Sequence, residues 1–328
     1  MFNALITEKI GDKEFRTGLG QRAIEDLPAG DLLIEVQYSS LNYKDALSAN
    51  GSPGVTRNFP HTPGIDAAGI VKESASEHFS VGDTVIVTGY DLGMETDGGL
   101  AEFIRVPATW ALALPSGLSA RDAMVLGTAG LTAGLCVNKL LQAGAVADEG
   151  KVIVTGATGG VGSVAVALLA KLGFQVVAST SKVSQHDLLK SLGATEIIDR
   201  ETLAAAERKP MLKPQWQNAV DCVGGDTLVN ILKSLGRSGS VACCGLVGSA
   251  DLPANVLPFI LRDVNLLGVD SVEIPLAKKQ HIWGMFSEEW KLDCLDQLAT
   301  EIQLEQVPEY LDKIIKGENI GRTVVRIK

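Results

Sequence analysis

The chain of 328 residues has few of the side chains that bind metals or form disulfides. It contains five cysteines and four histidines, and no Cys-x-x-Cys pair occurs. A catalytic zinc needs three Cys, His or carboxylate ligands and one open position, whereas these histidines are scattered without ligand spacing. The sequence therefore predicts no metal site, and its cysteines, in largely apolar stretches, do not make a disulfide framework.

Positive charge and long apolar runs are also scarce. Lys and Arg number 29 against 39 Asp and Glu, for a net charge of −10. Such an acidic surface repels phosphate backbones, so we expect no nucleic-acid partner. No apolar run approaches the roughly 18 residues that span a bilayer, and no signal peptide is visible. We expect a cytoplasmic protein with reduced cysteines and no membrane partner.

The length allows two domains, and the pattern changes character near residue 120. Before that point, short strand-like runs alternate with turn residues, which is typical of a compact, barrel-like β domain. The runs are residues 32–38, 69–71, 84–88 and 100–106.

After residue 120, helical segments and short apolar strands alternate. This order predicts a parallel sheet covered on both faces, and right-handed crossovers make it a doubly wound fold. The expected helices are residues 123–126, 132–141, 161–172, 186–192 and 228–235, and the expected strands 151–155, 175–179, 196–198, 219–223, 240–244 and 265–269.

The last stretch has helical patterns at residues 292–298 and 309–316 and one strand at 323–327. A single strand that follows a completed sheet needs a partner, and the N-terminal β domain offers one. We therefore predict a discontinuous catalytic domain, residues 1–122 with 274–328, and a nucleotide-binding domain, residues 123–273.

The sharpest local signal is a glycine-rich turn at residues 152–162, Val-Ile-Val-Thr-Gly-Ala-Thr-Gly-Gly-Val-Gly. It follows a strand and opens a helix, the context that dinucleotide binding requires. Gly159 lets the backbone approach a pyrophosphate, and Gly162 lets the helix pack on its strand. The helix N-terminus adds N–H groups and partial positive charge. A turn without a ligand is the alternative.

The second strand of this fold indicates which nucleotide binds. An NAD site places a carboxylate at its end to bind the ribose 2′-hydroxyl, whereas this strand is followed by Thr180, Ser181 and Lys182. Hydroxyls and a lysine suit a 2′-phosphate, and Arg200 follows the third strand. The pattern favours NADPH; the alternative is that Lys182 and Arg200 are solvated surface charges.

Several further stretches resemble the medium-chain dehydrogenase/reductases along the whole chain. They are residues 41–47, 63–69, 81–85, 98–102, 127–133, the glycine turn and 321–325. Residues 57–60, 257–262 and 268–272 are similar to the acrylyl-CoA reductase branch of the zinc-free quinone oxidoreductases. Zinc alcohol dehydrogenases of this superfamily carry His-Glu where this chain has Ile65-Asp66, and a Cys near its Asn42-Tyr43.

The resemblance implies a GroES-like β-barrel catalytic domain, a Rossmann domain that binds NADPH, and an active site in the cleft between them. It also implies cofactor contacts at Tyr43, Thr158, Gly159, Gly160, Val161, Thr180, Ser181, Lys182 and Arg200, with Leu246, Ile260, Ser271 and Asn319 along the nicotinamide half.

A reaction that hydride alone can start suits a site without a metal. We expect hydride addition to the β-carbon of an α,β-unsaturated thioester, acrylyl-CoA to propionyl-CoA, with donors on the developing oxyanion and a proton for the α-carbon. Tyr43 and Asn42 are the candidate donors; both can instead simply order the loop, and water can supply the proton. Asp66 is expected to be a buried structural carboxylate bound by backbone N–H groups.

Two other functions stay open: a zinc-free NADPH:quinone oxidoreductase, and a non-catalytic cofactor- or RNA-binding protein. For either of the two enzymatic functions the expected substrate is a small molecule, an acyl-CoA for the thioester reductase or a quinone for the quinone oxidoreductase. The strand at residues 265–269 would be an exposed sheet edge in a monomer. Pairing across a two-fold axis covers such an edge, so we expect a homodimer.

Overall fold

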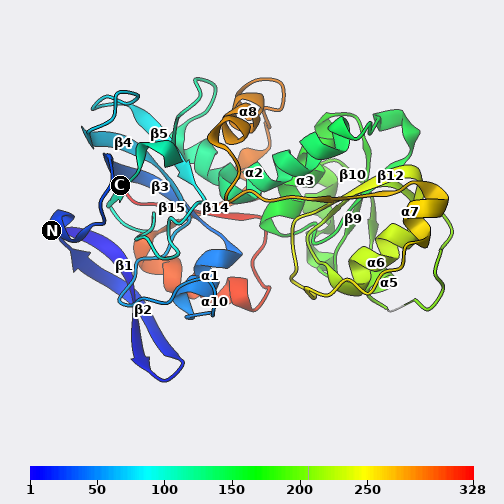
Figure 1. The fold of residues 1–328 in the computed structure, drawn as a ribbon, viewed down its shortest axis with the longest axis horizontal. Helices are drawn as coiled ribbons and strands as arrows, with labels where there is room; N and C mark the ends of the chain where they lie inside the picture. The colour runs from blue at the N-terminus through cyan, green and yellow to red at the C-terminus, as the bar shows by residue number, and fades with distance from the viewer. Residues whose placement is uncertain (206) are drawn as a thin grey trace. The chain divides into compact units, whose positions relative to one another are not determined.

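The computed structural model describes residues 1–205 and 207–328, and the chain divides into two compact units (Figure 1). Unit 1 comprises Met1–Thr128, Ser271–Lys291 and Leu298–Lys328, and unit 2 comprises Ala129–Asp270 and Leu292–Gln297. From the sequence, we predict that all of residues 274–328 belong to the catalytic domain. Leu292–Gln297, by contrast, belongs to unit 2.

Unit 1 is built on antiparallel strands. A hairpin, β1–β2, stands beside a larger sheet of order β14-β15-β3-β4-β5-β7, in which β6 also pairs with β3. The strands are β1 (Phe2–Gly11), β2 (Glu14–Arg22), β3 (Leu32–Leu41), β4 (Asp66–Ser74), β5 (Thr84–Thr88), β6 (Phe103–Val106), β7 (Ala111–Ala113), β14 (Ala299–Gln303) and β15 (Arg322–Arg326). The helices are α1 (Tyr43–Ala49), α8 (Leu276–Ser287) and α10 (Val307–Ile315).

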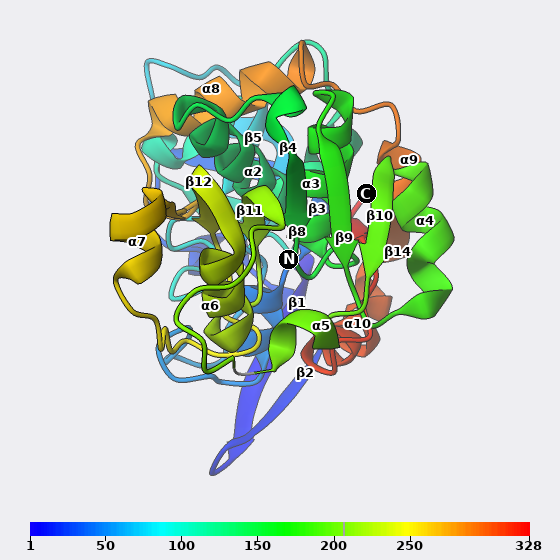
Figure 2. The same ribbon diagram turned by 90° about the vertical axis from the view of Figure 1, so that its right-hand side faces the viewer.

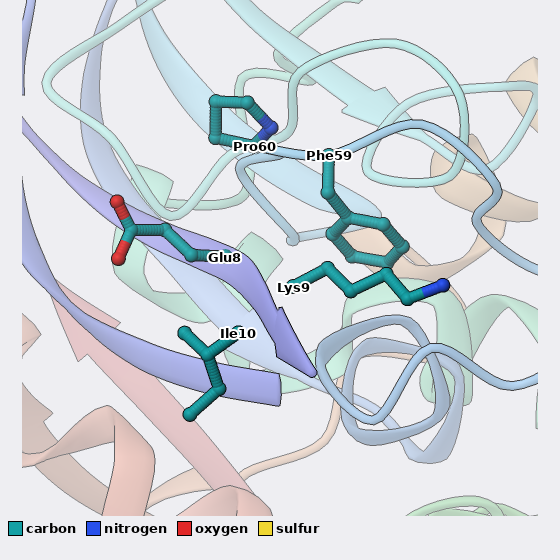
Figure 3. A pocket seen from close by; sticks show the side chains of 5 residues that line it. All are labelled: Glu8, Lys9, Ile10, Phe59 and Pro60. Carbon is teal, nitrogen blue, oxygen red and sulfur yellow. The ribbon is translucent and has the colours of Figure 1, made fainter. Parts of the chain in front are cut away.

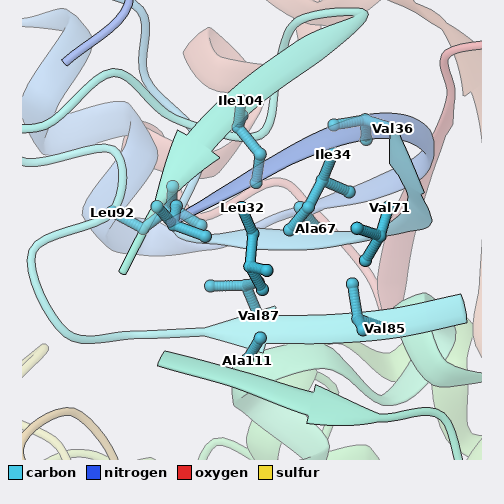
Figure 4. Close-up of a cluster of buried hydrophobic side chains, with 11 residues drawn as sticks. Leu32, Ile34, Val36, Ala67, Val71, Val85, Val87, Leu92, Ile104 and Ala111 are labelled. Carbon is cyan, nitrogen blue, oxygen red and sulfur yellow. The ribbon is translucent and has the colours of Figure 1, made fainter. Parts of the chain in front are cut away.

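The core of this unit follows from alternation along its strands. Leu32, Ile34 and Val36 of β3 point to one face, because successive side chains of a strand alternate. They pack with Val85 and Val87 of β5 in a fully buried cluster (Figure 4). Aliphatic side chains at every second position thus hold the strands of the barrel-like domain together.

The closing strand finds the partner expected from the sequence. β15 pairs antiparallel with β3, Thr323 opposite Leu41 and Val325 opposite Ser39, and parallel with β14. Residues from the two ends of the chain therefore share one sheet.

Unit 2 is a six-stranded parallel sheet of order β10-β9-β8-β11-β12-β13. Counted from β8, this is the 3-2-1-4-5-6 order of a dinucleotide-binding fold, with the reversal of direction beside β8. The strands run side by side in Figure 2, with α4 beyond β10. They are β8 (Lys151–Val154), β9 (Gln175–Ser179), β10 (Ala194–Ile198), β11 (Trp216–Asp221), β12 (Leu235–Cys243) and β13 (Asn265–Gly268). The helices are α3 (Gly160–Lys171), α4 (His186–Ser191), α5 (Glu201–Ala204), α6 (Gly225–Ser234), α7 (Leu257–Arg262) and α9 (Leu295–Leu298).

One long helix, α2 (Ala120–Gln142), joins the two units in sequence. Gly127 interrupts it with φ +53° and ψ −157°, so α2 is two helices separated by a kink. Among the described residues it is the one helix long and apolar enough to cross a membrane, and 83% of its most apolar stretch is buried in the structure. That burial is typical of a core helix in a globular protein.

Candidate cofactor site and active site

The glycine turn between β8 and α3 is shaped for close backbone approach. Gly156 has φ +60°, a left-handed conformation that glycine adopts without cost. A Cβ on Gly162 would lie 2.3 Å from the carbonyl oxygen of Gly156, so no other residue fits there. The first N–H groups of α3, those of Gly160 to Gly162, have no partner within the helix. The turn can therefore present N–H groups to an anion.

A buried polar network that the sequence analysis missed supports this turn. Asp221, at the end of β11, accepts hydrogen bonds from Thr155 Oγ1 (2.7 Å) and from the N–H of Gly224 (2.8 Å). Thr155 Oγ1 accepts in turn from the N–H of Cys222 (3.0 Å). Burial raises the pKa of Asp221. These bonds tie the end of β8 to the end of β11, where the order of the strands reverses.

The residues proposed to distinguish NADPH from NADH meet at the ends of β9 and β10. Thr180 Oγ1 lies 3.4 Å from Thr158 Oγ1 and accepts from the N–H of Lys182 (3.0 Å). The carbonyl of Thr180 accepts from the N–H of Arg200 (3.3 Å). Ser181, between Thr180 and Lys182 in the sequence, is exposed. The structure thus gathers the residues after both strands around the backbone of Thr180.

Arg200 carries a neighbour that the sequence analysis overlooked. Its Nε lies 3.1 Å from Glu201 Oε1, and both side chains are about two-thirds exposed (66% and 70%). Such an exposed pair is worth less than about 1 kcal/mol, so a phosphate can displace Glu201. Arg200 therefore stays a candidate, beside Lys182, for recognition of a 2′-phosphate.

The four residues expected along the nicotinamide half fall in both units. Leu246 and Ile260 of unit 2 are 64% and 69% exposed, unusual for large apolar side chains. Ser271 and Asn319 belong to unit 1. Ser271 is buried, and Asn319 Oδ1 accepts from Thr323 Oγ1 (3.1 Å). That the four line one site remains a prediction.

Tyr43 and Asn42 begin helix α1 in unit 1. Tyr43 is the first helical residue and is 44% exposed. Asn42 caps the helix, and its N–H donates to Asp45 Oδ2 (2.7 Å). Its side-chain amide donates to Asp66 Oδ2 (2.7 Å) and its Oδ1 accepts from Arg322 (3.3 Å). Because the amide of Asn42 is engaged inside the protein, Tyr43 is the better donor for a substrate.

Asp66 and Arg322 form a buried ion pair beneath this loop. Their side chains are 0% and 3% exposed, with Nη2 and Oδ2 3.9 Å apart. Asp66 also accepts from Ser40 Oγ (2.7 Å) and from Thr128, through the N–H (2.9 Å) and Oγ1 (2.6 Å). Asp66 is thus buried as expected, but side chains rather than backbone N–H groups make most of its bonds.

A second buried carboxylate lies next to the first. Asp45 Oδ1 accepts from the N–H of Ile65 (2.8 Å). Burial, together with the negative charge of Asp66, raises the pKa of Asp45 to about 7. Burial also lowers the pKa of Arg322. The positive charge of Arg322 therefore interacts with both Asp66 and Asp45 at the base of the Asn42–Tyr43 loop.

The kink in α2 makes room for this cluster. A Cβ on Gly127 would lie 2.5 Å from Ser40 Oγ, 2.6 Å from Asp66 Oδ2 and 2.7 Å from Arg322 Nη2. Gly127 is therefore required by space as well as by its positive φ, and the kink turns the N–H of Thr128 toward Asp66. Within residues 1–205 and 207–328, no three His, Cys, Asp or Glu side chains are grouped to hold a metal ion.

A separate hollow of about 320 Å³ lies in unit 1, lined by Glu8, Lys9 and Ile10 of β1 with Phe59 and Pro60 (Figure 3). None of the predicted site residues lines it. It is therefore not assigned to the cofactor or active site.

Comparison with known families defines the class of protein. Residues 28–116 match the alcohol dehydrogenase GroES-like domain, and residues 160–288 match the zinc-binding dehydrogenase family. The GroES-like and Rossmann parts of the predicted fold are thereby confirmed. The chain belongs to the medium-chain dehydrogenase/reductase superfamily.

Within the superfamily, whole-chain similarity points to the AcuI/YhdH type. The chain is 46% identical to probable acrylyl-CoA reductase AcuI of Escherichia coli, over 92% of each chain. It is 42% identical to acrylyl-CoA reductase AcuI of Ruegeria pomeroyi, over 100% of this chain and 99% of that one. Putative quinone oxidoreductase YhfP of Bacillus subtilis is 44% identical over the same shares.

Solved structures agree with this placement. The YhdH oxidoreductase of Salmonella enterica in complex with NADP superposes with a TM-score of 0.96, at 46% identity, over 99% of this chain and 100% of that one. The Bacillus subtilis YhfP structure with NAD bound also has a TM-score of 0.96, at 45% identity, over 99% of both chains. The predicted resemblance to the acrylyl-CoA reductase branch is confirmed.

Proposed function

We propose that this protein is an NADPH-dependent reductase of the activated C=C bond of a 2-enoyl thioester, with acrylyl-CoA to propionyl-CoA as its reaction. The observation that carries the proposal is the 42–46% identity to two AcuI proteins over 92–100% of the chain. The Salmonella relative bound to NADP adds support for the nucleotide.

The residues at the nucleotide half-site fit NADPH. The missing Cβ of Gly162 lets the turn pack closely against the start of α3, and the N-terminus of that helix suits a diphosphate. Thr180, Ser181 and Lys182 follow β9, where an NAD site would have a carboxylate. A 2′-phosphate therefore finds hydroxyls and an ammonium group in place of a repelling charge.

The chemistry requires hydride delivery, oxyanion stabilisation and a proton. Bound NADPH supplies the hydride that adds to the β-carbon of the thioester. We propose that Tyr43, exposed at the start of α1, donates a hydrogen bond to the thioester oxygen, and that the α-carbon receives its proton from Tyr43 or from water. Asn42, Asp66 and Arg322 act as positioning residues, because their hydrogen bonds fix the start of α1. We propose that no metal takes part.

Steady-state kinetics test the assignment. The purified protein is assayed with NADPH and either acrylyl-CoA or 1,4-benzoquinone, and kcat/KM is compared. We expect the thioester to be preferred by at least about a hundredfold, a difference of about 2.7 kcal/mol in transition-state binding. If kcat/KM were instead about a hundredfold higher for the quinone, the proposal would be overturned.

A quinone reductase is the second candidate, favoured by the name of the YhfP relative. Its structure with NAD bound also makes NADH the coenzyme to compare. Activity with quinone and NADH alone would select this alternative.

We further propose a homodimer in the cytoplasm. β13 ends the sheet of unit 2 with no neighbour beyond it among the described strands, and an exposed edge invites pairing with a second copy. Light scattering on the purified protein should give twice the 34.5 kDa chain mass; a single-chain mass would contradict the dimer.

A further inference from the structure

Three thiols gather at the carboxyl edge of the parallel sheet in unit 2. Cys222 directly follows β11, and Cys244 directly follows β12. Their Sγ atoms are 3.8 Å apart. The thiol of Cys136, in α2, forms a hydrogen bond with Cys244. No cysteine of the described chain is in a disulfide.

Cys222 and Cys244 each lie one residue beyond the last register pair of β11 and β12. Asp221 and Cys243 are register partners in the parallel pair β11–β12, and the N–H of Cys244 donates to the carbonyl of Asp221 (3.0 Å). Paired strands lie about 4.8 Å apart, within the Cα separation of about 4.4–6.8 Å found in disulfides. Side-chain rotation that closes the sulfur gap by about 1.8 Å would form the bond.

The three thiols are not equivalent. Cys136 is fully buried, whereas Cys222 and Cys244 are partly exposed. Hydrogen bonds from Cys136 and Cys222 lower the pKa of Cys244, and those same bonds raise the pKa of the two donors. The thiolate is the reactive form of cysteine. Cys244 contacts both other thiols, so oxidation of Cys244 leaves Cys222 Sγ in reach, 3.8 Å away.

The pair lies beside the nucleotide half-site. A Cβ on Gly156 of the glycine turn would be 3.4 Å from Cys222 Cβ, and one on Gly245 would be 2.2 Å from the carbonyl oxygen of Cys222. The N–H of Gly248 donates to the carbonyl of Val223 (2.8 Å). The loops after β11 and β12 are thus tightly packed, and a shift of either cysteine moves a loop that adjoins the turn.

We propose that Cys222 and Cys244 are a reversible oxidation site, which a peroxide converts into a disulfide that weakens nucleotide binding. Cys244 Sγ attacks the O–O bond of hydrogen peroxide, which gives a sulfenic acid and, after protonation of the leaving hydroxide, water. Cys222 Sγ then attacks Cys244 Sγ and displaces a second hydroxide, which takes a proton. The two thiols lose two electrons in total, and one peroxide becomes two waters. The effect on nucleotide binding rests on the proposed function.

Peptide mapping tests the bond itself. The reduced protein is treated with hydrogen peroxide, quenched with an alkylating agent, digested without reductant and analysed by mass spectrometry. We expect one cross-linked peptide pair, Cys222 with Cys244, that dithiothreitol separates. Cys222→Ser should instead leave a sulfenic acid on Cys244 that dimedone traps, and Cys243→Ser, a matched neighbour, should still form the bond. A different pairing, or no pairing in wild type and Cys243→Ser, overturns the proposal.

Nucleotide titration tests the consequence. We expect the Kd for NADPH to rise about tenfold on oxidation, to recover with dithiothreitol and to stay unchanged in peroxide-treated Cys222→Ser. Prior addition of NADP should slow the oxidation. A disulfide that leaves the Kd unchanged refutes the link to binding. Failure of the reduced protein to bind NADPH refutes the proposed function instead, while the cross-link result stands by itself.

Discussion

Removal of one partner from the buried ion pair Asp66–Arg322 should lower the free energy of unfolding strongly. Arg322→Met takes away the cation and four hydrogen bonds, to the carbonyls of Val125 and Leu41, to Asn42 and to Ser40. Asp66→Asn removes the negative charge at nearly constant volume. Each single substitution leaves an uncompensated buried group, for which we expect a loss of about 3–5 kcal/mol in the free energy of unfolding.

The geometry also gives the coupling between the two residues. Charges 3.9 Å apart interact by about 4 kcal/mol at an effective dielectric constant of about 20. Asp66 keeps other donors, and Arg322 other acceptors, so a double-mutant cycle should return somewhat less, about 2–3 kcal/mol. The double variant is then less destabilised than the sum of the two single variants.

Urea unfolding followed by tryptophan fluorescence measures these losses. Three of the four tryptophans, Trp110, Trp283 and Trp290, belong to unit 1, and Trp216 to unit 2. The signal therefore reports mainly the unit that contains the ion pair. The midpoint and slope of each variant give its free energy of unfolding.

An exposed pair in the same unit is the control. Arg16 Nη2 and Glu8 Oε2 are closer, at 2.7 Å, but their side chains are 70% and 49% exposed. Because water screens them, Arg16→Met should cost less than about 1 kcal/mol. Additive effects of the Asp66 and Arg322 substitutions, or equal losses at Arg16 and Arg322, would refute the reasoning from burial.

Four further predictions follow from the site. Gly162→Ala should weaken NADPH binding at least about tenfold by fluorescence titration, because its Cβ has no space, whereas Gly284→Ala meets nothing within 4 Å and should bind normally. Lys182→Asp should raise the Kd for NADPH about tenfold or more above any change for NADH; equal losses would contradict 2′-phosphate recognition. Tyr43→Phe should lower kcat/KM for the thioester about tenfold with an unchanged urea midpoint, and unchanged kinetics would remove the phenol from the mechanism. Asp45 has a pKa near 7 when folded against an ordinary 3.8, so it binds more protons in the folded state and stability should fall as pH rises from about 4 to 7; Asp45→Asn should flatten that slope in urea titrations across pH.

Regular patterning made unit 2 predictable. The expected strands at residues 175–179 and 265–269 agree with β9 and, within one residue, with β13, since buried parallel strands are continuous apolar runs bounded by turns. Unit 1 was less predictable. The hairpin β1–β2 was missed because Glu14–Arg22 is half polar and half exposed, with three glycines or threonines that carry little strand signal.

The candidate site also had a part that the sequence predicted and a part that it did not. The glycine turn is local, so its spacing alone indicated a nucleotide. The network around Asp66 joins Ser40, Thr128 and Arg322, which are far apart in sequence, and no local pattern marks such partners. The glycine at position 127 was a usable signal, because a glycine inside a helical pattern indicates a close approach. The pairing of Arg200 with Glu201 depends on side-chain conformation, which composition does not determine.

The position of β15 has a consequence for how the protein is made. Arg322 emerges from the ribosome 282 residues after Ser40, its hydrogen-bond partner. During that interval one edge of β3 lacks its neighbour, and Asp66 lacks its cation, while the whole of residues 129–270 has already been synthesised. Residues 129–270 of unit 2 can thus begin to fold on the nascent chain, whereas the buried network of unit 1 stays incomplete until Arg322 is made. A ribosome that stalls before Arg322 leaves an open strand edge that invites aggregation.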